Sequence, residues 1–357
     1  MKTPVWIFVK IAPALAVILL VGSYKSSLFG TADYQRAAGR LLSGQDFYGY
    51  INYDERSFQA IMARDGPADV TVLVAGSSRT MQLDADCFDG KYYNASVSGA
   101  MISDLAAIVE QFRRGRTLKH VVFAADPWML NAHEQYEAWD GVRIAPNLDR
   151  VHAAPDWIRA QVRLGLTPNW REFTVAARAV LDPYREILAP ASYQAAWKAR
   201  IEGPPLKDAN PDNLFRKQPD GSLRYPGFIV NAPAEHVAAA ARNAADSHLE
   251  ATYVGFNRID PFLARAFEAV TADVVARGAR VTLVLAPFHL VYYQRVIHHE
   301  NGKLLPAVEA YFRNLAHQRG YKVIGSYDPA AVGAAASDFF DGVHLKKGAL
   351  KRLYGCP

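Results

Sequence analysis

The sequence holds little cysteine and no strong excess of either charge. Cys87 and Cys356 are its only cysteines, which excludes a disulfide-dense scaffold and any Cys-x-x-Cys metal site. A single bridge can join them, although the penultimate position of Cys356 favours a frayed end. Forty Lys and Arg residues against 35 Asp and Glu leave a formal net charge of +5. This excess is small and scattered, so charge does not favour nucleic acid as a partner.

Several short motifs are absent as well. No G-x-G-x-x-G follows a strand-like run and no G-x-x-x-x-G-K-[ST] occurs, which excludes the common nucleotide-binding turns. No serine lies in a G-x-S-x-G frame, which argues against the nucleophile turn of α/β-hydrolases. His133-Glu134 lacks the second histidine of H-E-x-x-H, and the adjacent His298 and His299 would point in different directions. We therefore expect neither a cofactor nor a metal site.

Length and composition are those of an ordinary globular protein. The 357 residues have room for about two domains, or for one large domain with an insertion. Half of the residues are apolar and 21% are charged, which excludes disordered and fibrous classes.

The amino-terminal residues 4–24 form an apolar run, PVWIFVKIAPALAVILLVGSY. Its only charge is Lys10, and a membrane-spanning helix needs about 20 mostly apolar residues. Lys2 precedes the run, which favours an amino terminus in the cytoplasm and a main domain on the other side of the membrane. The alternatives are a cleaved signal peptide, with small residues near Gly22, and a buried core helix. We expect an uncleaved single-pass anchor.

Short β-branched runs alternate with amphipathic segments in two parts of the chain. The runs predict buried strands at 70–75, 121–125, 281–286 and 322–324. The apolar spacing between them predicts helices at 101–114, 260–278, 305–319 and 345–354. Such alternation is typical of a parallel sheet covered by helices on both faces, so we expect a three-layer α/β/α fold.

Between about 140 and 250 this alternation is lost. The segment is rich in proline, and tryptophans lie in helix-like stretches near its start and middle. We interpret it as an inserted, mainly helical cap, whose aromatic residues either line a binding groove or pack onto the core. The expected divisions are an anchor or signal at 1–24, a stalk and first helix at 25–68, the first part of the core at 69–139, the cap at 140–255, and the second part of the core at 256–357.

Two short motifs lie near the ends of the predicted core. The first strand runs into 76–80, GSSRT, where a glycine permits a sharp turn that can present a serine hydroxyl and its backbone N–H. Residues 341–344, DGVH, place Asp341 three positions before His344 in a tight turn. That carboxylate can accept the Nδ1–H of the imidazole, which leaves the other nitrogen to take a proton from Ser78. These are the nucleophile, base and orienting acid that acyl transfer requires.

Both motifs resemble the SGNH, or GDSL-like, hydrolase family, over about 70–126 and 260–354. That family has its nucleophile in a Gly-x-Ser turn after the first strand, and its acid and base in a D-x-x-H turn near the end. The resemblance implies that Ser78 is the nucleophile, Asp341 the acid and His344 the base. It also implies a flavodoxin-like form of the α/β/α fold.

The oxyanion hole is assigned through the same resemblance. The SGNH family has several short sequence motifs, called blocks. Residues 94–99, NASVSG, look like the second block, whose glycine N–H donates to the oxyanion. The N–H groups of Gly99 and Ser78 are therefore the expected donors. Ser77 is the competing nucleophile, but the glycine-plus-two spacing favours Ser78.

The third block departs from the family pattern. The family usually has Gly-x-Asn-Asp there, with the asparagine donating to the oxyanion, whereas this chain has Asp126 in the sequence AADPW. An ionised carboxylate cannot donate, and one lost donor costs about 10²–10³ in rate. We therefore expect Asp126 to be protonated at the oxyanion hole, turned to orient another group, or a sign of changed chemistry.

Three further residues are candidates for binding substrate. Arg79 either steers an anionic polymer into the site or pairs with an acid at the sheet edge. His289 follows the strand at 281–286, so it either lines the same crevice or is a solvated loop histidine. Trp128 follows the third block, and we assign it to substrate binding together with Arg79 and His289.

The G-S-S-R form, the departure at Asp126 and the anchor narrow the resemblance to membrane-anchored SGNH-like proteins of bacterial cell-envelope polymer acylation. The resemblance implies a serine acyl-ester hydrolase or O-acyltransferase in the inner membrane, with its main domain in the periplasm. The implied partners are a polysaccharide or acylated polymer and a membrane-bound acyltransferase. One alternative is a catalytically degenerate binding or assembly protein. Another is a metal-dependent phosphoesterase, with Asp84, Asp86, Asp126 and His289 as ligands.

Overall fold

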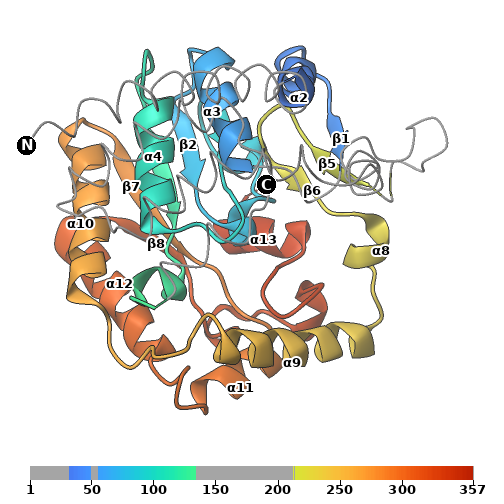
Figure 1. Cartoon of the computed structure of the whole chain (residues 1–357), viewed down its shortest axis with the longest axis vertical. Helices are drawn as coiled ribbons and strands as arrows, with labels where there is room; N and C mark the ends of the chain where they lie inside the picture. The colour runs from blue at the N-terminus through green and yellow to red at the C-terminus, as the bar shows by residue number, and fades with distance from the viewer. Residues whose placement is uncertain (1–31, 50–54, 134–211, 213, 357) are drawn as a thin grey trace, which may run out of the picture.

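A parallel sheet of five strands forms the centre of the protein (Figure 1). The computed structural model describes residues 32–49, 55–133, 212 and 214–356. Neighbouring strands are parallel, in the order β3-β2-β4-β7-β8. The strands are β2 (Val72–Ala75), β3 (Tyr92–Asn94), β4 (His120–Ala124), β7 (Arg280–Leu285) and β8 (Lys322–Gly325). The four predicted strands are thus confirmed to within a few residues, and β3 is an addition.

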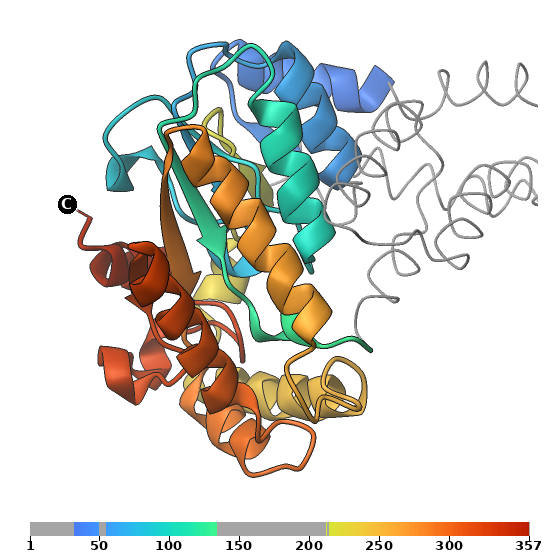
Figure 2. The same cartoon turned by 90° about the vertical axis from the view of Figure 1, so that its left-hand side faces the viewer.

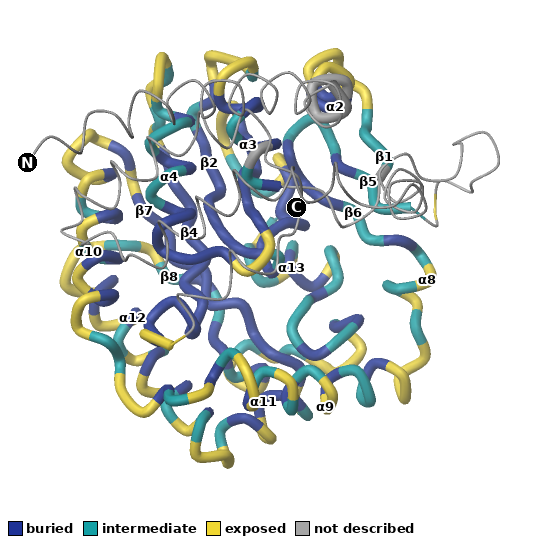
Figure 3. The backbone as a smooth tube through the Cα atoms, in the orientation of Figure 1, coloured by how far each residue is buried: buried dark blue, intermediate teal, exposed yellow. Residues whose placement is uncertain are grey.

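Helices cover both faces of this sheet (Figure 2). Successive side chains of a strand point to opposite faces, so β2 sends Leu73 into one apolar core and Val72 into the other. The larger core is covered by α3 (Glu55–Asp65), α4 (Ile102–Phe112), α10 (Pro261–Ala276) and α12 (Leu305–Arg319). The smaller core is covered mainly by α13 (Lys347–Tyr354). Figure 3 shows the strands of the sheet as the most deeply buried part of the chain. The predicted α/β fold with a helix-flanked parallel sheet is confirmed.

A second, smaller sheet joins two distant parts of the chain. It is antiparallel, in the order β1-β5-β6, with β1 (Phe47–Gly49), β5 (Phe215–Lys217) and β6 (Leu223–Arg224). Strand β1 lies in the range predicted as a stalk, and β5 and β6 lie in the range predicted as a cap. The described end of the cap range is therefore paired with the range predicted as a stalk and first helix.

Four further α-helices lie among the described residues. They are α2 (Ala32–Leu42), α8 (Gly227–Val230), α9 (Ala234–Glu250) and α11 (Leu290–Ile297). Helix α9 also belongs to the predicted cap range, and it packs along α11 at the lower edge of Figure 1. The alanines of α9 are small enough to permit this close approach: Ala241 and Ala245 are fully buried.

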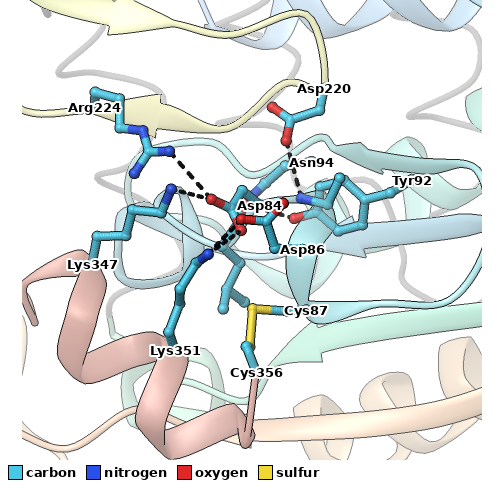
Figure 4. Close-up of a disulfide and its surroundings, with 12 residues drawn as sticks. Asp84, Asp86, Cys87, Tyr92, Asn94, Asp220, Arg224, Lys347, Lys351 and Cys356 are labelled. Carbon is cyan, nitrogen blue, oxygen red and sulfur yellow. Dashed lines mark hydrogen bonds and ion pairs between the residues drawn. A yellow bond between two sulfur atoms is a disulfide. The ribbon is translucent and has the colours of Figure 1, made fainter.

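A disulfide closes the carboxyl end of the chain (Figure 4). Cys356 follows α13 and bonds to Cys87, at a sequence separation of 269 residues. The expectation that Cys356 lies in a frayed end is wrong, because the bridge and the packing of α13 on the sheet hold it in place. Beside the bridge, Asp84 contacts Lys347 of α13 and accepts a hydrogen bond from Arg224 at 3.2 Å.

The predicted membrane anchor, residues 4–24, lies outside the described residues, as does most of the predicted cap. Among the helices that the structure describes, none is long and apolar enough to span a bilayer.

Candidate active site

The candidate site lies where the order of the strands changes direction. Strands β2 and β4 are neighbours, and the chain leaves them toward opposite sides, to β3 and to β7. In open α/β sheets, ligands bind outside the carboxyl ends of such strands. Here β2 continues into Gly76 and the serines, and β4 continues into Asp126. Gly76 is required, since a Cβ would lie 2.3 Å from Thr80 Oγ1 and 2.7 Å from Ala124 Cβ.

Ser78, His344 and Asp341 form a continuous chain of hydrogen bonds. Ser78 Oγ lies 2.8 Å from His344 Nε2, and His344 Nδ1 lies 2.7 Å from Asp341 Oδ2. The contact predicted between the serine hydroxyl and the imidazole is therefore present. The carboxylate side of the chain favours a proton on Nδ1, which leaves the Nε2 lone pair facing the serine.

The turn around Asp341 holds its carboxylate in place. The second oxygen, Oδ1, accepts the N–H groups of Val343 at 2.8 Å and His344 at 2.7 Å. Burial alone raises the pKa of Asp341, but His344 and these N–H donors outweigh burial and hold the pKa below its usual value. The acid is therefore kept ionised for its role as an acceptor.

Two aromatic rings contact the imidazole of His344. Phe340 is nearly parallel to it at 5.5 Å between ring centroids, and the centroid of Tyr225 lies 5.8 Å from the imidazole and 4.7 Å from Phe340. Tyr225 also contacts Phe215 of β5. Sequence analysis missed Tyr225, because it follows a two-residue strand in a segment without regular apolar spacing.

The structure separates the two serines of the turn. Ser77 is fully buried, and its hydroxyl accepts the backbone N–H of Arg79 at 3.2 Å, capping the short 3₁₀ helix Ser78–Thr80. Ser78 is partly exposed and is the serine that contacts His344. The spacing argument for Ser78 thus agrees with the geometry.

The loop that carries Gly99 runs beside the serine turn. Val97 N–H donates to Gly76 O at 2.9 Å, and the Ser96 and Thr80 hydroxyls lie 2.9 Å apart. Gly99 is exposed and has a φ of +56°, a conformation that favours glycine. Within the described residues, neither its N–H nor that of Ser78 has a hydrogen-bond partner. Both N–H groups are therefore free to donate to a ligand.

Asp126 pairs with Arg79. Arg79 Nη1 donates to Asp126 Oδ1 at 2.9 Å, and both side chains are 1% exposed. Burial raises the pKa of Asp126, although Arg79 and Ser77 oppose the rise. Of the three alternatives for Asp126, the geometry matches the second, in which the carboxylate orients another group. A direct role in an oxyanion hole stays a prediction.

Arg79 ties the serine turn to the histidine turn. Its guanidinium donates to Val343 O at 3.3 Å, to Pro287 O at 3.1 Å and to Ala286 O, and it lies over the Phe288 ring at 3.8 Å. Arg79 therefore shows the predicted pairing with an acid at the sheet edge. A contact between this buried side chain and an anionic polymer stays a prediction.

Trp128 and His289 are also built into the scaffold of the site. Trp128 is 8% exposed, and its indole N–H donates to Ala100 O at 3.2 Å. His289 is 2% exposed. Its ring Nδ1 accepts the backbone N–H of Val291, and its backbone N–H donates to Gly342 O. The description of His289 as a solvated loop histidine is wrong, because it is buried against α11. Substrate contacts by either residue stay predictions.

The acids considered as metal ligands are engaged elsewhere. Asp84 and Asp86 contact lysines of α13 (Figure 4). Asp126 pairs with Arg79. In the part of the chain that the structure describes, no group of three or more His, Cys, Asp or Glu side chains could hold a metal ion.

The fold and the site together define an α/β protein with a Ser-His-Asp arrangement at the switch point of a parallel sheet. Comparison of the chain with protein-family models finds no match, and comparison with curated proteins finds none either.

Proposed function

We propose that this protein is an extracytoplasmic serine acyl-ester hydrolase or O-acyltransferase of the SGNH type, acting on a cell-envelope polysaccharide or a similar polymer. The observation that carries the proposal is the Ser78–His344–Asp341 chain, at 2.8 and 2.7 Å. The strand order β3-β2-β4-β7-β8 corresponds to the flavodoxin-like order 2-1-3-4-5, which supports the finer fold assignment.

The first chemical step forms an acyl-serine. His344 Nε2 takes the proton of Ser78 as the serine oxygen bonds to the ester carbonyl carbon. The carbonyl oxygen becomes an oxyanion, which accepts the N–H groups of Ser78 and Gly99. His344 then gives its proton to the leaving alcohol as the old ester bond breaks. Asp341 stays ionised throughout and stabilises the imidazolium.

The second step removes the acyl group from Ser78. Water attacks the acyl carbon in a hydrolase, and a sugar hydroxyl attacks it in a transferase. His344 accepts the proton of the attacking hydroxyl and returns it to the serine oxygen. Both outcomes use the same residues, so the acceptor decides between them.

The proposed compartment is the periplasm, with a single-pass anchor at residues 4–24. The Cys87–Cys356 bridge supports it, since structural disulfides persist mainly in oxidising compartments. The proposed partners remain an acylated polymer and a membrane-bound acyltransferase.

Acyl trapping tests the proposal. The protein is incubated with p-nitrophenyl acetate, and peptide mass spectrometry locates the acetylated residue. We expect a Ser78-dependent acetyl group in wild type, retained in Ser77→Ala and lost in Ser78→Ala. Added oligosaccharide then separates hydrolysis from acyl transfer, because only a transferase produces an acetylated sugar. Equal inertness of wild type and Ser78→Ala would favour the alternative, a binding or assembly protein, which Asp126 in place of asparagine motivates.

A further inference from the structure

We propose that Glu55 is a positioning residue for the oxyanion hole: it holds the loop at Ser98 so that the Gly99 N–H points toward the substrate carbonyl. This inference rests on the proposed function. Glu55 is the first residue of α3, far from either catalytic motif in the sequence. Its role follows from contacts that reach the loop before and after Gly99.

The Glu55 carboxylate binds both polar groups at the start of the loop. One oxygen accepts the backbone N–H of Ser98, and the other lies 3.2 Å from the Ser98 hydroxyl. Glu55 is buried and Ser98 is exposed, so these bonds tie an exposed loop to the interior. A bond between an ionised carboxylate and an N–H is charge-assisted and is stronger than a neutral one. The residue directly before Gly99 is therefore held through both its N–H and its hydroxyl.

The next residue of α3 holds the same loop from the carbonyl side. Arg56 donates to Ser98 O at 3.3 Å and makes a two-bond contact with Asp104, at 2.7 Å for each bond. Asp104 in turn accepts the Met101 N–H at 2.9 Å. Ser98 and Met101 thus have their backbone held by charged side chains on two neighbouring helices.

Trp128 completes the support by donating to Ala100 O. The loop is therefore bound at Ser98 N–H, Ser98 O, Ala100 O and Met101 N–H. Among the described residues, the Gly99 N–H between these points has no partner. A scaffold that binds the flanking groups and leaves this donor exposed is what a preorganised oxyanion hole requires.

A buried lysine explains why a carboxylate is tolerated at this position. Lys217 of β5 is 3% exposed and attracts Glu55 electrostatically, as does Arg56. Burial raises the pKa of Glu55 and lowers that of Lys217 to about 8, and the mutual attraction opposes both shifts. Strand β5 lies in the range predicted as the cap, so the attraction between Lys217 and Glu55 also connects that part of the chain to the loop that carries Gly99.

Three variants test the inference through p-nitrophenyl acetate hydrolysis. Glu55→Ala removes both contacts to Ser98. Glu55→Gln keeps them, because the amide oxygen can accept the N–H and the amide nitrogen can donate to the hydroxyl. Glu309→Ala is the matched control, since Glu309 holds the Ser326 hydroxyl and the Tyr327 N–H in the same manner on the loop after β8.

We expect Glu55→Ala to lose about 10- to 100-fold in kcat with little change in KM, a partial loss of one oxyanion donor. Glu55→Gln should recover most of that loss, and Glu309→Ala should keep kcat within about threefold while its Tm falls comparably. The pH dependence of the Glu55→Ala rate should keep its midpoint, because the Ser78–His344–Asp341 contacts are untouched.

The outcomes separate the two proposals. If wild type hydrolyses the ester through Ser78 and Glu55→Ala retains its kcat, the positioning role is overturned and the proposed function stands. An equal loss in Glu55→Gln, or a loss in Glu309→Ala as large as in Glu55→Ala, also overturns it. If wild type matches Ser78→Ala, the proposed function itself fails.

Discussion

The Arg79–Asp126 pair gives the sharpest test of how this site is built. The SGNH pattern that the sequence resembles has an asparagine that donates to the oxyanion at the position of Asp126, whereas the Asp126 carboxylate accepts a bond from Arg79 in a 1% exposed environment. Asp126→Asn therefore distinguishes two roles. As the partner of Arg79, the asparagine would still accept that bond and the rate would not rise. As an oxyanion donor, it would raise kcat about 10²–10³-fold.

The magnitudes follow from the contacts. Asp126→Asn replaces the ion pair with a bond from the charged guanidinium to a neutral amide oxygen. Backbone carbonyls of Val343, Ala286 and Pro287 still accept from that guanidinium, so we expect a cost of only about 1 kcal/mol of unfolding free energy. Arg79→Met removes the same bond, leaves the carboxylate buried without its partner, and frees the carbonyls of Val343 and Pro287. We expect it to cost about 3–5 kcal/mol, the usual cost of breaking a buried ion pair from one side.

Urea unfolding of the two single variants and the double variant measures these energies, and ester hydrolysis measures the rate. The Arg79→Met/Asp126→Asn double variant should unfold with a smaller loss than the sum of the singles, because no unpaired charge is left. It should still lose activity, since Val343 next to His344 is no longer held. A large rise in kcat in Asp126→Asn, or equal costs for both singles, would refute the reasoning.

Three further predictions concern other contacts. Replacing Cys87 and Cys356 together by serine should cost about 2–4 kcal/mol in urea unfolding, and a cost near zero would show that the bridge does not restrain the unfolded chain. His120, whose pKa burial lowers to about 4, is neutral in the folded protein below the unfolded value near 6.5. The free energy of unfolding should therefore fall as the pH is lowered from 6.5 to 4, by up to about 2 kcal/mol at pH 5. His120→Gln should reduce this pH dependence, and an unchanged dependence would refute its assignment to His120. Gly342→Ala would bring a Cβ to 3.0 Å from the backbone of α9 and so shift the histidine turn. We expect kcat/KM to fall by up to about 10²-fold with the fold intact by circular dichroism, and an unchanged rate would contradict a tight turn.

The buried strands were predictable because both faces of the sheet are covered. Strands β2, β4 and β7 are nearly continuous apolar runs for this reason, and the sequence shows them directly. Strand β3 has only three residues, Tyr92–Asn94, and lies among polar residues, so no pattern marks it. Helix α9 lies in the range predicted as a mainly helical cap, but its bounds were not predicted, because its alanines give little contrast between its buried and exposed faces.

The candidate triad was accessible from short motifs, whereas its supports were not. Ser78 and His344 each lie in a recognisable turn. Arg79, Asp126 and Glu55 act through contacts between segments that are distant in the sequence, and only their three-dimensional arrangement shows what they hold. Arg79 was ambiguous for a physical reason: the same cation serves an anionic ligand on the surface or a carboxylate in the interior.

The disulfide has a consequence for how the molecule is completed during synthesis. Ser78 and His344 are separated by 266 positions, so the nucleophile is made long before its base. Helix α13 begins at Lys347, three residues after the histidine, and Cys356, which fastens it, comes later still. A nascent chain that has not yet reached Cys356 would have every triad side chain and no disulfide to hold α13 against the earlier segment. The bridge can therefore form only after Cys356 has left the ribosome, in whatever compartment supplies the oxidant.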